Sequence, residues 1–210
     1  VITHMYRDIA AHNIGTLTHV GLNTFVDPRN GGGKLNDVTK EDLVSIVNFD
    51  GAERLLYKTF PIDIVLVRAS YADELGNCTV HKEIGPLDVT AMAQACKNSG
   101  GKVIVQVEKI VQAGSLDPKL VKIPGIYVDA VVVGSDEDNM QCLGMPYDGA
   151  LTGEFRIPVD KIPEVPLNAR KIVARRAAME LTENAIVNLG TGMPEVIANV
   201  AAEEGISDYM

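Results

Sequence analysis

The stretch IDIVLVRA, from Ile62 to Ala69, is almost entirely aliphatic and decides the fold class of this chain. Such a short apolar run predicts a strand buried inside a sheet. A second buried strand is predicted over Lys102–Val107, and a helix over Pro86–Asn98 lies between the two and ends at Gly100 and Gly101. Because strands alternate with a helix, the class is α/β with a largely parallel sheet.

The same patterns predict elements on both sides of this unit. A short helix is expected between Val1 and Gly15, and Asp50-Gly51 predicts a hairpin turn between strands Val44–Phe49 and Arg54–Thr59. A further strand is predicted over Ile126–Val133, and Asn168 should cap a helix that runs to about Glu183. On the helix predicted over Pro86–Asn98, the expected buried stripe is Leu87, Ala91 and Ala95. On the helix that Asn168 caps, it is Val173, Ala177 and Leu181.

The stretch AIVNLGTGMPEVI, from Ala185 to Ile197, predicts a strand, a glycine turn and a helix start in close succession. Its apolar first half should form a buried strand, and proline suits the first turn of a helix. Free backbone N–H groups at such a helix start favour an anionic or polar ligand. The predicted binding residues are therefore Gly190, Thr191, Gly192, Met193 and Pro194.

The organisation of the chain changes between Gly134 and Pro166, where periodicity disappears and glycine and proline turns recur. We expect residues 1–150 to form one part, 151–166 a linker, and 167–210 the start of a second part. The chain opens on Val1 within an apolar segment and stops where a strand is due, so we expect it to be a piece of a longer protein.

Composition narrows the classes of partner. The net charge of −9 argues against a nucleic-acid partner, which requires a basic surface. No segment has the apolar length of a membrane span, so no membrane partner is expected. Three cysteines without CxxC spacing favour a reducing compartment, and cytoplasm is the expectation. The one basic cluster, formed by Arg170, Lys171, Arg175 and Arg176, is expected to be a solvated helix face.

Other candidate chemical groups have simpler explanations. Glu108 ends a predicted strand and could be a nucleophile, but a structural carboxylate is the preferred interpretation. Glu195 suits the positive end of a helix better than a general-base role. The run Gly31–Lys34 lacks the remaining P-loop residues, and the Gly190–Gly192 turn lacks the third glycine of a dinucleotide fingerprint. The histidines show no metal spacing, so no metal site is predicted.

Several segments, taken in order along nearly the whole chain, resemble the family I coenzyme A-transferases of the propionate or acetate type. No single segment is specific; the series is. The segments are Val20–Arg29, Phe60–Asp63, Ala72–Asn77, Val105–Val111, Ile123–Asp129, Ala169–Ala178 and Asn188–Pro194.

The resemblance implies a sugar-isomerase-like fold of two related α/β halves with the active site between them, the first half partial here and the second only begun. It implies that a glutamate attacks acyl-CoA, becomes a glutamyl-CoA thioester, and passes coenzyme A to a second short-chain carboxylic acid. That glutamate is expected after Met210, so no catalytic residue is assigned. Coenzyme A would be a co-substrate with no further cofactor, and a homo-oligomer is expected. The alternatives are an acyl-CoA hydrolase on this scaffold and a non-catalytic α/β binding module.

Overall fold

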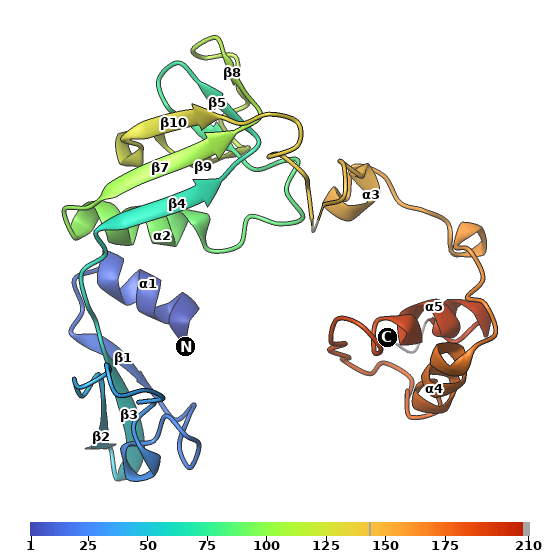
Figure 1. Ribbon diagram of the computed structural model, residues 1–210, viewed down its shortest axis with the longest axis horizontal. Helices are drawn as coiled ribbons and strands as arrows, with labels where there is room; N and C mark the ends of the chain where they lie inside the picture. The colour runs from blue at the N-terminus through green and yellow to red at the C-terminus, as the bar shows by residue number, and fades with distance from the viewer. Residues whose placement is uncertain (143, 208–210) are drawn as a thin grey trace. The chain divides into compact units, whose positions relative to one another are not determined.

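A computed structural model describes residues 1–142 and 144–207, which form two compact units, Val1–Thr152 and Gly153–Met210 (Figure 1). Within this described part, no helix combines the length and the apolar character needed to cross a bilayer. The assignment of residues 1–150, 151–166 and 167–210 to a first half, a linker and a second half stays a prediction.

The first unit is built on a parallel sheet of three strands. Strands β4 (Ile64–Arg68), β7 (Lys102–Val107) and β10 (Ala130–Val133) lie in the order β10-β7-β4, with β7 in the centre (Figure 1). Helix α2 (Val89–Asn98) packs on one face of the sheet through Ala93 and Cys96. The predicted α/β class with a parallel sheet is confirmed.

The sheet is buried on one face only within the described unit. Val103, Val105 and Val107 are fully buried against α2, whereas Ile64 and Leu66 are 61% and 73% exposed. The predicted strand forms, but its burial is limited to alternate residues, Val65 and Val67. Successive side chains of a strand point to opposite faces, so covering one face hides only every second residue.

Helix α2 begins three residues later than predicted. Leu87 precedes it with a positive φ of 43° and is 88% exposed, so it cannot belong to the buried stripe. Ala91 and Ala95 are buried as expected. A residue with positive φ is incompatible with the right-handed helix, and this conformation delays the helix start.

A second, mixed sheet continues beyond the carboxyl ends of β4 and β7. Asp73 ends one of its strands and accepts hydrogen bonds from the backbone N–H groups of Leu75 and Asn77 at 3.0 and 2.9 Å, which fix a tight turn. Sequence patterns did not identify its short strands. The strands, in the order β8-β5-β6-β9, are β5 (Tyr71–Asp73), β6 (Cys78–Thr79), β8 (Lys109–Val111) and β9 (Val121–Ile123).

The amino-terminal elements follow the predicted pattern closely. Helix α1 (Ile2–Ala10) packs beside α2, and strands β2 (Val44–Phe49) and β3 (Ala52–Lys58) form the predicted antiparallel hairpin. The short strand β1 (Gly15–Thr18) pairs with β3 and was not predicted. The glycine run after the 3₁₀ turn Pro28–Asn30 is a loop.

The second unit contains helices α4 (Ala169–Ala178) and α5 (Val196–Glu203). The side chain of Asn168 accepts a hydrogen bond from the N–H of Lys171 at 3.1 Å, which confirms the predicted cap. The helix ends five residues before Glu183. Helix α3 (Gly149–Thr152) and a 3₁₀ turn at Val159–Lys161 interrupt the chain before α4.

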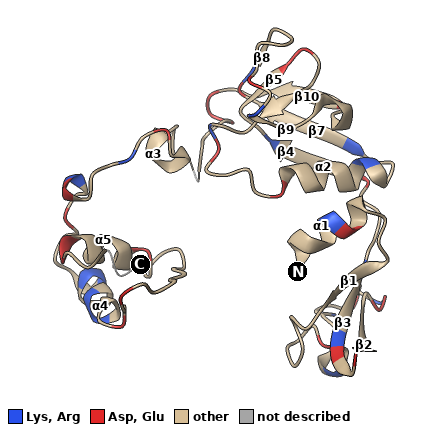
Figure 2. Cartoon of the chain, turned by 180° about the vertical axis from the view of Figure 1, so that it is seen from behind, with Lys and Arg blue, Asp and Glu red and all other residues tan. Residues whose placement is uncertain are grey.

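The buried face of α4 differs from the predicted stripe. Ala174 and Ala178 pack against Val200 of α5, while Val173 is 51% exposed. Figure 2 shows basic residues along α4, yet Lys171 is buried, so the expectation of a wholly solvated basic cluster is wrong for this residue. A short helix packed against a single partner buries a narrow stripe, and helix docking selects that stripe.

The strand predicted at the start of the Ala185–Ile197 stretch is absent. Residues 185–190 have no regular structure, and Ile186 is fully exposed. No strand exists among the described residues of the second unit, so this apolar run has nothing with which to pair. An unpaired strand leaves its backbone N–H and C=O groups without partners, which explains why the run stays irregular.

Candidate functional site

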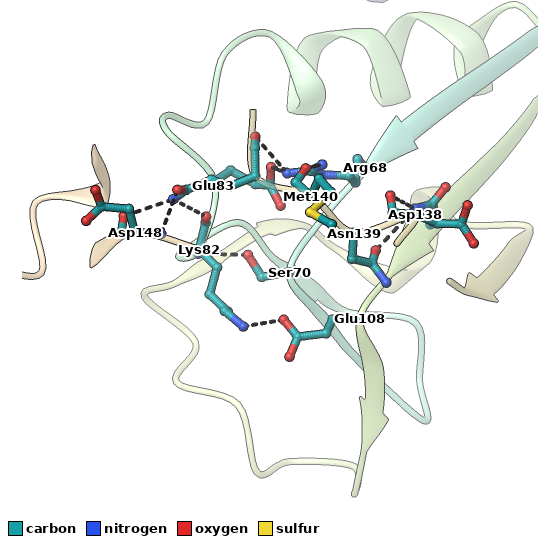
Figure 3. A network of polar contacts seen from close by, with 11 residues as sticks. Arg68, Ser70, Lys82, Glu83, Glu108, Asp138, Asn139, Met140 and Asp148 are labelled. Carbon is teal, nitrogen blue, oxygen red and sulfur yellow. Dashed lines mark hydrogen bonds and ion pairs between the residues drawn. The ribbon is translucent and has the colours of Figure 1, made fainter. Parts of the chain in front are cut away.

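The carboxyl ends of the three parallel strands gather polar and charged side chains at one edge of the sheet. β4 ends at Arg68, Glu108 directly follows β7, and the segment after β10 returns to this edge through Asn139 and Gln141 (Figure 3). Open parallel sheets place their ligands at this edge, because loops from several strands converge there. The edge is therefore the candidate site of the first unit.

Arg68 holds this edge together. Its guanidinium pairs with Glu83, with Nη2 2.6 Å from Oε2, and it donates hydrogen bonds to the backbone carbonyls of Met140 and Gln141. All of these bonds join segments far apart in the sequence. Because its donors are engaged by protein groups, Arg68 has a structural role.

Two buried polar side chains fix the backbone of Lys82. The hydroxyl of Ser70 accepts a hydrogen bond from the Lys82 N–H at 2.8 Å, and the Gln141 amide donates to the Lys82 carbonyl at 3.1 Å. Gln141 also bonds the backbone of Asp148 in both directions. Such satisfied buried groups leave little freedom to the chain at this position.

The side chain of Lys82 pairs with Glu108 (Figure 3). Its Nζ lies 4.8 Å from the ring centre of Tyr147 and 5.8 Å from that of Tyr71. Partial burial by itself would lower the pKa of Lys82, but the hydrogen bond and charge of Glu108 outweigh it and raise that pKa. Lys82 therefore carries its positive charge at neutral pH.

A small cavity of about 20 Å³ lies beside this ion pair. It offers roughly the volume that one water requires, so in this conformation it has room for a water-sized group and not for a larger ligand. Its lining is charged and polar, with cations and carboxylates in equal number, which suits a hydrogen-bonding group. The lining includes Arg68, Ser70, Lys82, Glu108, Asn139 and Tyr147.

The predicted binding residues Gly190–Pro194 lie in the second unit as an exposed loop that precedes α5. Gly192 has a φ of +92°, a conformation that favours glycine, and its carbonyl accepts a hydrogen bond from Arg170 at 3.0 Å. A cavity of about 360 Å³ with Arg170, Asn168 and Glu195 in its lining lies next to the loop. The ligand role of these five residues stays a prediction.

The contacts of the other residues singled out from the sequence give none of them a catalytic or metal-binding role. Glu108, kept as a structural carboxylate, is in an ion pair, and no group of His, Cys, Asp or Glu among the described residues could hold a metal ion. Burial raises the pKa of the Cys78 thiol to about 12, so it is no thiolate nucleophile at neutral pH. Sequence reasoning missed Lys82 and Tyr147, because neither follows a predicted strand; the position of Glu108 at a strand end was the available signal.

Comparison with known proteins gives a consistent result. Residues 9–134 match the family model described as coenzyme A transferase. The chain is 50% identical over 207 residues to caffeate CoA-transferase of Acetobacterium woodii, covering 98% of this chain and 39% of that protein. It is 44% identical over 208 residues to acetate CoA-transferase YdiF of Escherichia coli (strain K12), covering 99% and 39%. The chain thus spans about two fifths of the length of these relatives.

Solved structures agree with these similarities. The structure of an acyl-CoA transferase from E. coli O157:H7, titled as a thioester complex with CoA, superposes with a TM-score of 0.87 at 44% identity over 98% of this chain and 41% of that chain. Glutaconate coenzyme A-transferase from Acidaminococcus fermentans gives a TM-score of 0.54 at 18% identity over 72% of this chain and 49% of that chain, a likeness of fold alone.

Proposed function

We propose, because this chain belongs to the coenzyme A transferase family, that the protein carrying it transfers coenzyme A between an acyl-CoA and a free carboxylic acid. The observation that carries the proposal is the 50% identity to a CoA-transferase along 98% of the chain.

The finer proposal concerns the reaction path and the acid. A carboxylate of the protein attacks the acyl carbonyl of acyl-CoA, which releases the coenzyme A thiolate and leaves an acyl anhydride. The thiolate then attacks the protein's own carbonyl, so the acid leaves and a glutamyl-CoA thioester remains; a second acid reverses both steps. The thioester complex with CoA observed for the similar E. coli acyl-CoA transferase supports this path. We assign the nucleophile to no residue of this chain.

The acid is proposed to be a short-chain carboxylate of the acetate or propionate class. The name of the acetate CoA-transferase relative supports acetate, while the caffeate relative marks aromatic acids as the competing class. Coenzyme A serves as co-substrate and no other cofactor is proposed. A cytoplasmic homo-oligomer remains part of the proposal.

The loop Gly190–Pro194 is proposed to contact coenzyme A or the reacting thioester. The loop is largely exposed, so its backbone is accessible to a ligand, and Gly192 has the positive φ that favours glycine. Such donors, aimed at a developing oxyanion in a dry site, contribute a few kcal/mol each.

The test uses the longer protein that contains this sequence. Incubation with acetyl-CoA and isotopically labelled propionate should give labelled propionyl-CoA, measured by mass spectrometry, at a rate that depends on the propionate concentration. Borohydride treatment after acyl-CoA alone should reduce a single glutamyl thioester. Release of free coenzyme A at a rate independent of the acid would instead establish the hydrolase alternative and reject the transferase.

A further inference from the structure

We propose that Lys82 binds the carboxylate of the acid substrate and that Glu108 occupies this position in the free protein. The proposal rests on the proposed function for the nature of the ligand. In this proposal the ammonium of Lys82 is the binding group, and the carboxylate of Glu108 occupies the site until the carboxylate of the acid replaces it.

The fold holds the ammonium of Lys82 in place without using all of its hydrogen-bond donors. Its backbone is fixed by Ser70 and Gln141, and the rings of Tyr71 and Tyr147 lie 5.8 and 4.8 Å from its Nζ. Aromatic faces stabilise a cation without using its hydrogen-bond donors. An ammonium has three donors, and within the described chain its side-chain acceptor is the carboxylate of Glu108, so donors remain for a ligand.

The neighbouring pair between Arg68 and Glu83 provides the contrast. Arg68 also reaches two backbone carbonyls, so the removal of Glu83 would still leave its guanidinium held. Glu108 has no second partner of this kind: among the described residues its carboxylate bonds to Lys82 alone. Its side chain is 32% exposed, so water reaches the carboxylate, weakens the ion pair and can solvate Glu108 when it leaves. An incoming carboxylate can therefore replace it at small cost.

The local charge also favours a second anion. The Nζ of Lys109 lies 4.2 Å from the ring centre of Tyr71, and within the described part of the chain it forms no ion pair. Two ammonium groups thus surround Tyr71, while Glu108 supplies the carboxylate that pairs with Lys82. The ammonium of Lys109, with which no carboxylate of the described residues pairs, attracts an acid in its ionised form.

The dimensions limit which part of the acid enters. The cavity beside the pair admits a group of about one water, so a carboxylate head fits only where the Glu108 carboxylate moves out. The remainder of the acid must extend toward solvent, and the site would recognise the carboxylate and leave the chain length to other residues.

The experiment measures acetate binding by the 210-residue chain without coenzyme A, from amide chemical shifts at constant ionic strength with chloride as the balancing anion. Shifts should centre on Ser70, Lys82 and Glu108. Lys82→Met should abolish saturable binding, and Lys82→Arg should retain it. Glu108→Gln should tighten binding by about two- to fivefold, the factor expected when an exposed ion pair no longer competes.

Lys102→Met is the matched control, because Lys102 also pairs with a carboxylate, at the opposite end of β7. It should leave the acetate affinity unchanged. Unaltered binding in Lys82→Met, weaker binding in Glu108→Gln, or no saturable binding by the unmodified chain would each overturn the proposal. Coenzyme A exchange by the longer protein together with any of these results would leave the proposed function standing and reject only the carboxylate site.

Discussion

The strand β7 and the run Ala185–Val187 carry the same aliphatic signal and have opposite fates. β7 lies between two parallel strands and its Val103, Val105 and Val107 are fully buried, whereas Ile186 is fully exposed in irregular chain. The difference teaches that an apolar run specifies a strand only where neighbouring strands satisfy its backbone hydrogen bonds. The first unit provides those neighbours within the described residues, and the second does not.

A pair of matched substitutions tests this difference with the largest expected effect. Val105→Asp places a carboxylate in the centre of the buried face and should lower the free energy of unfolding of the first unit by at least about 4 kcal/mol. Ile186→Asp should leave stability unchanged within about 0.5 kcal/mol, because Ile186 is solvated. Urea unfolding followed by circular dichroism measures both, and a large loss in Ile186→Asp would show that this run is buried after all.

The stability of the second unit should depend instead on the buried ammonium of Lys171. Lys171 Nζ lies 2.7 Å from Glu203 and 3.0 Å from Glu164, and the hydrogen bond from Lys171 keeps the pKa of Glu203 low. Lys171→Met removes the cation and leaves the carboxylate of Glu203 with the Val165 N–H but without a buried positive charge, so the urea midpoint of this unit should fall, though by less than Val105→Asp lowers that of the first.

Arg175→Met is the control for that change, since Arg175 pairs with Glu204 while half exposed. It should shift the midpoint little. Equal effects of the two substitutions would mean that burial does not distinguish Lys171 from the other basic residues of α4.

Low pH should destabilise the first unit by protonating Asp129, whose carboxylate bonds to the first residues of β7. Asp129 accepts a hydrogen bond from the N–H of Val103 at 2.9 Å, and this bond, with Lys97 and Lys102, holds the pKa of Asp129 well below its usual range. Its stabilisation is present above about pH 4, the pKa of an unfolded aspartate, and is lost as the pH falls toward the folded value. Urea midpoints between pH 6 and 3 should therefore fall more steeply for the unmodified chain than for Asp129→Asn. Parallel curves would contradict this linkage.

The smallest effect concerns the cap of α4. Asn168→Ala removes the hydrogen bond to the Lys171 N–H and should lower the free energy of unfolding of the second unit by about 1 kcal/mol. Asn168→Asp preserves an acceptor and should restore most of it. Because the asparagine side chain does not titrate, the Asn168→Ala loss should stay constant between pH 6 and 3; a loss that changes with pH would indicate a different role.

The fold was predictable wherever a local pattern and its neighbours agree. The hairpin around Asp50-Gly51, strand β7 and the Asn168 cap all follow from residues close in sequence. The short strands β5, β6, β8 and β9 were missed, because two or three residues carry no period. The family resemblance, carried by a series of segments, was confirmed, while the ligand role of Gly190–Pro194 stays a prediction.

The sequence by itself determined the α/β class, the family and the helix and strand signals, because these depend on composition, period and motif order. Only the tertiary structure decided that Lys82 meets Glu108 and Tyr147, that Lys171 is buried, and that Ala185–Val187 stays unpaired. Glu108 follows Lys82 by 26 positions, and its contact exists because β7 and the turn after β6 end at the same edge. A pattern along the chain reports local preference, whereas burial and pairing depend on segments that folding brings together.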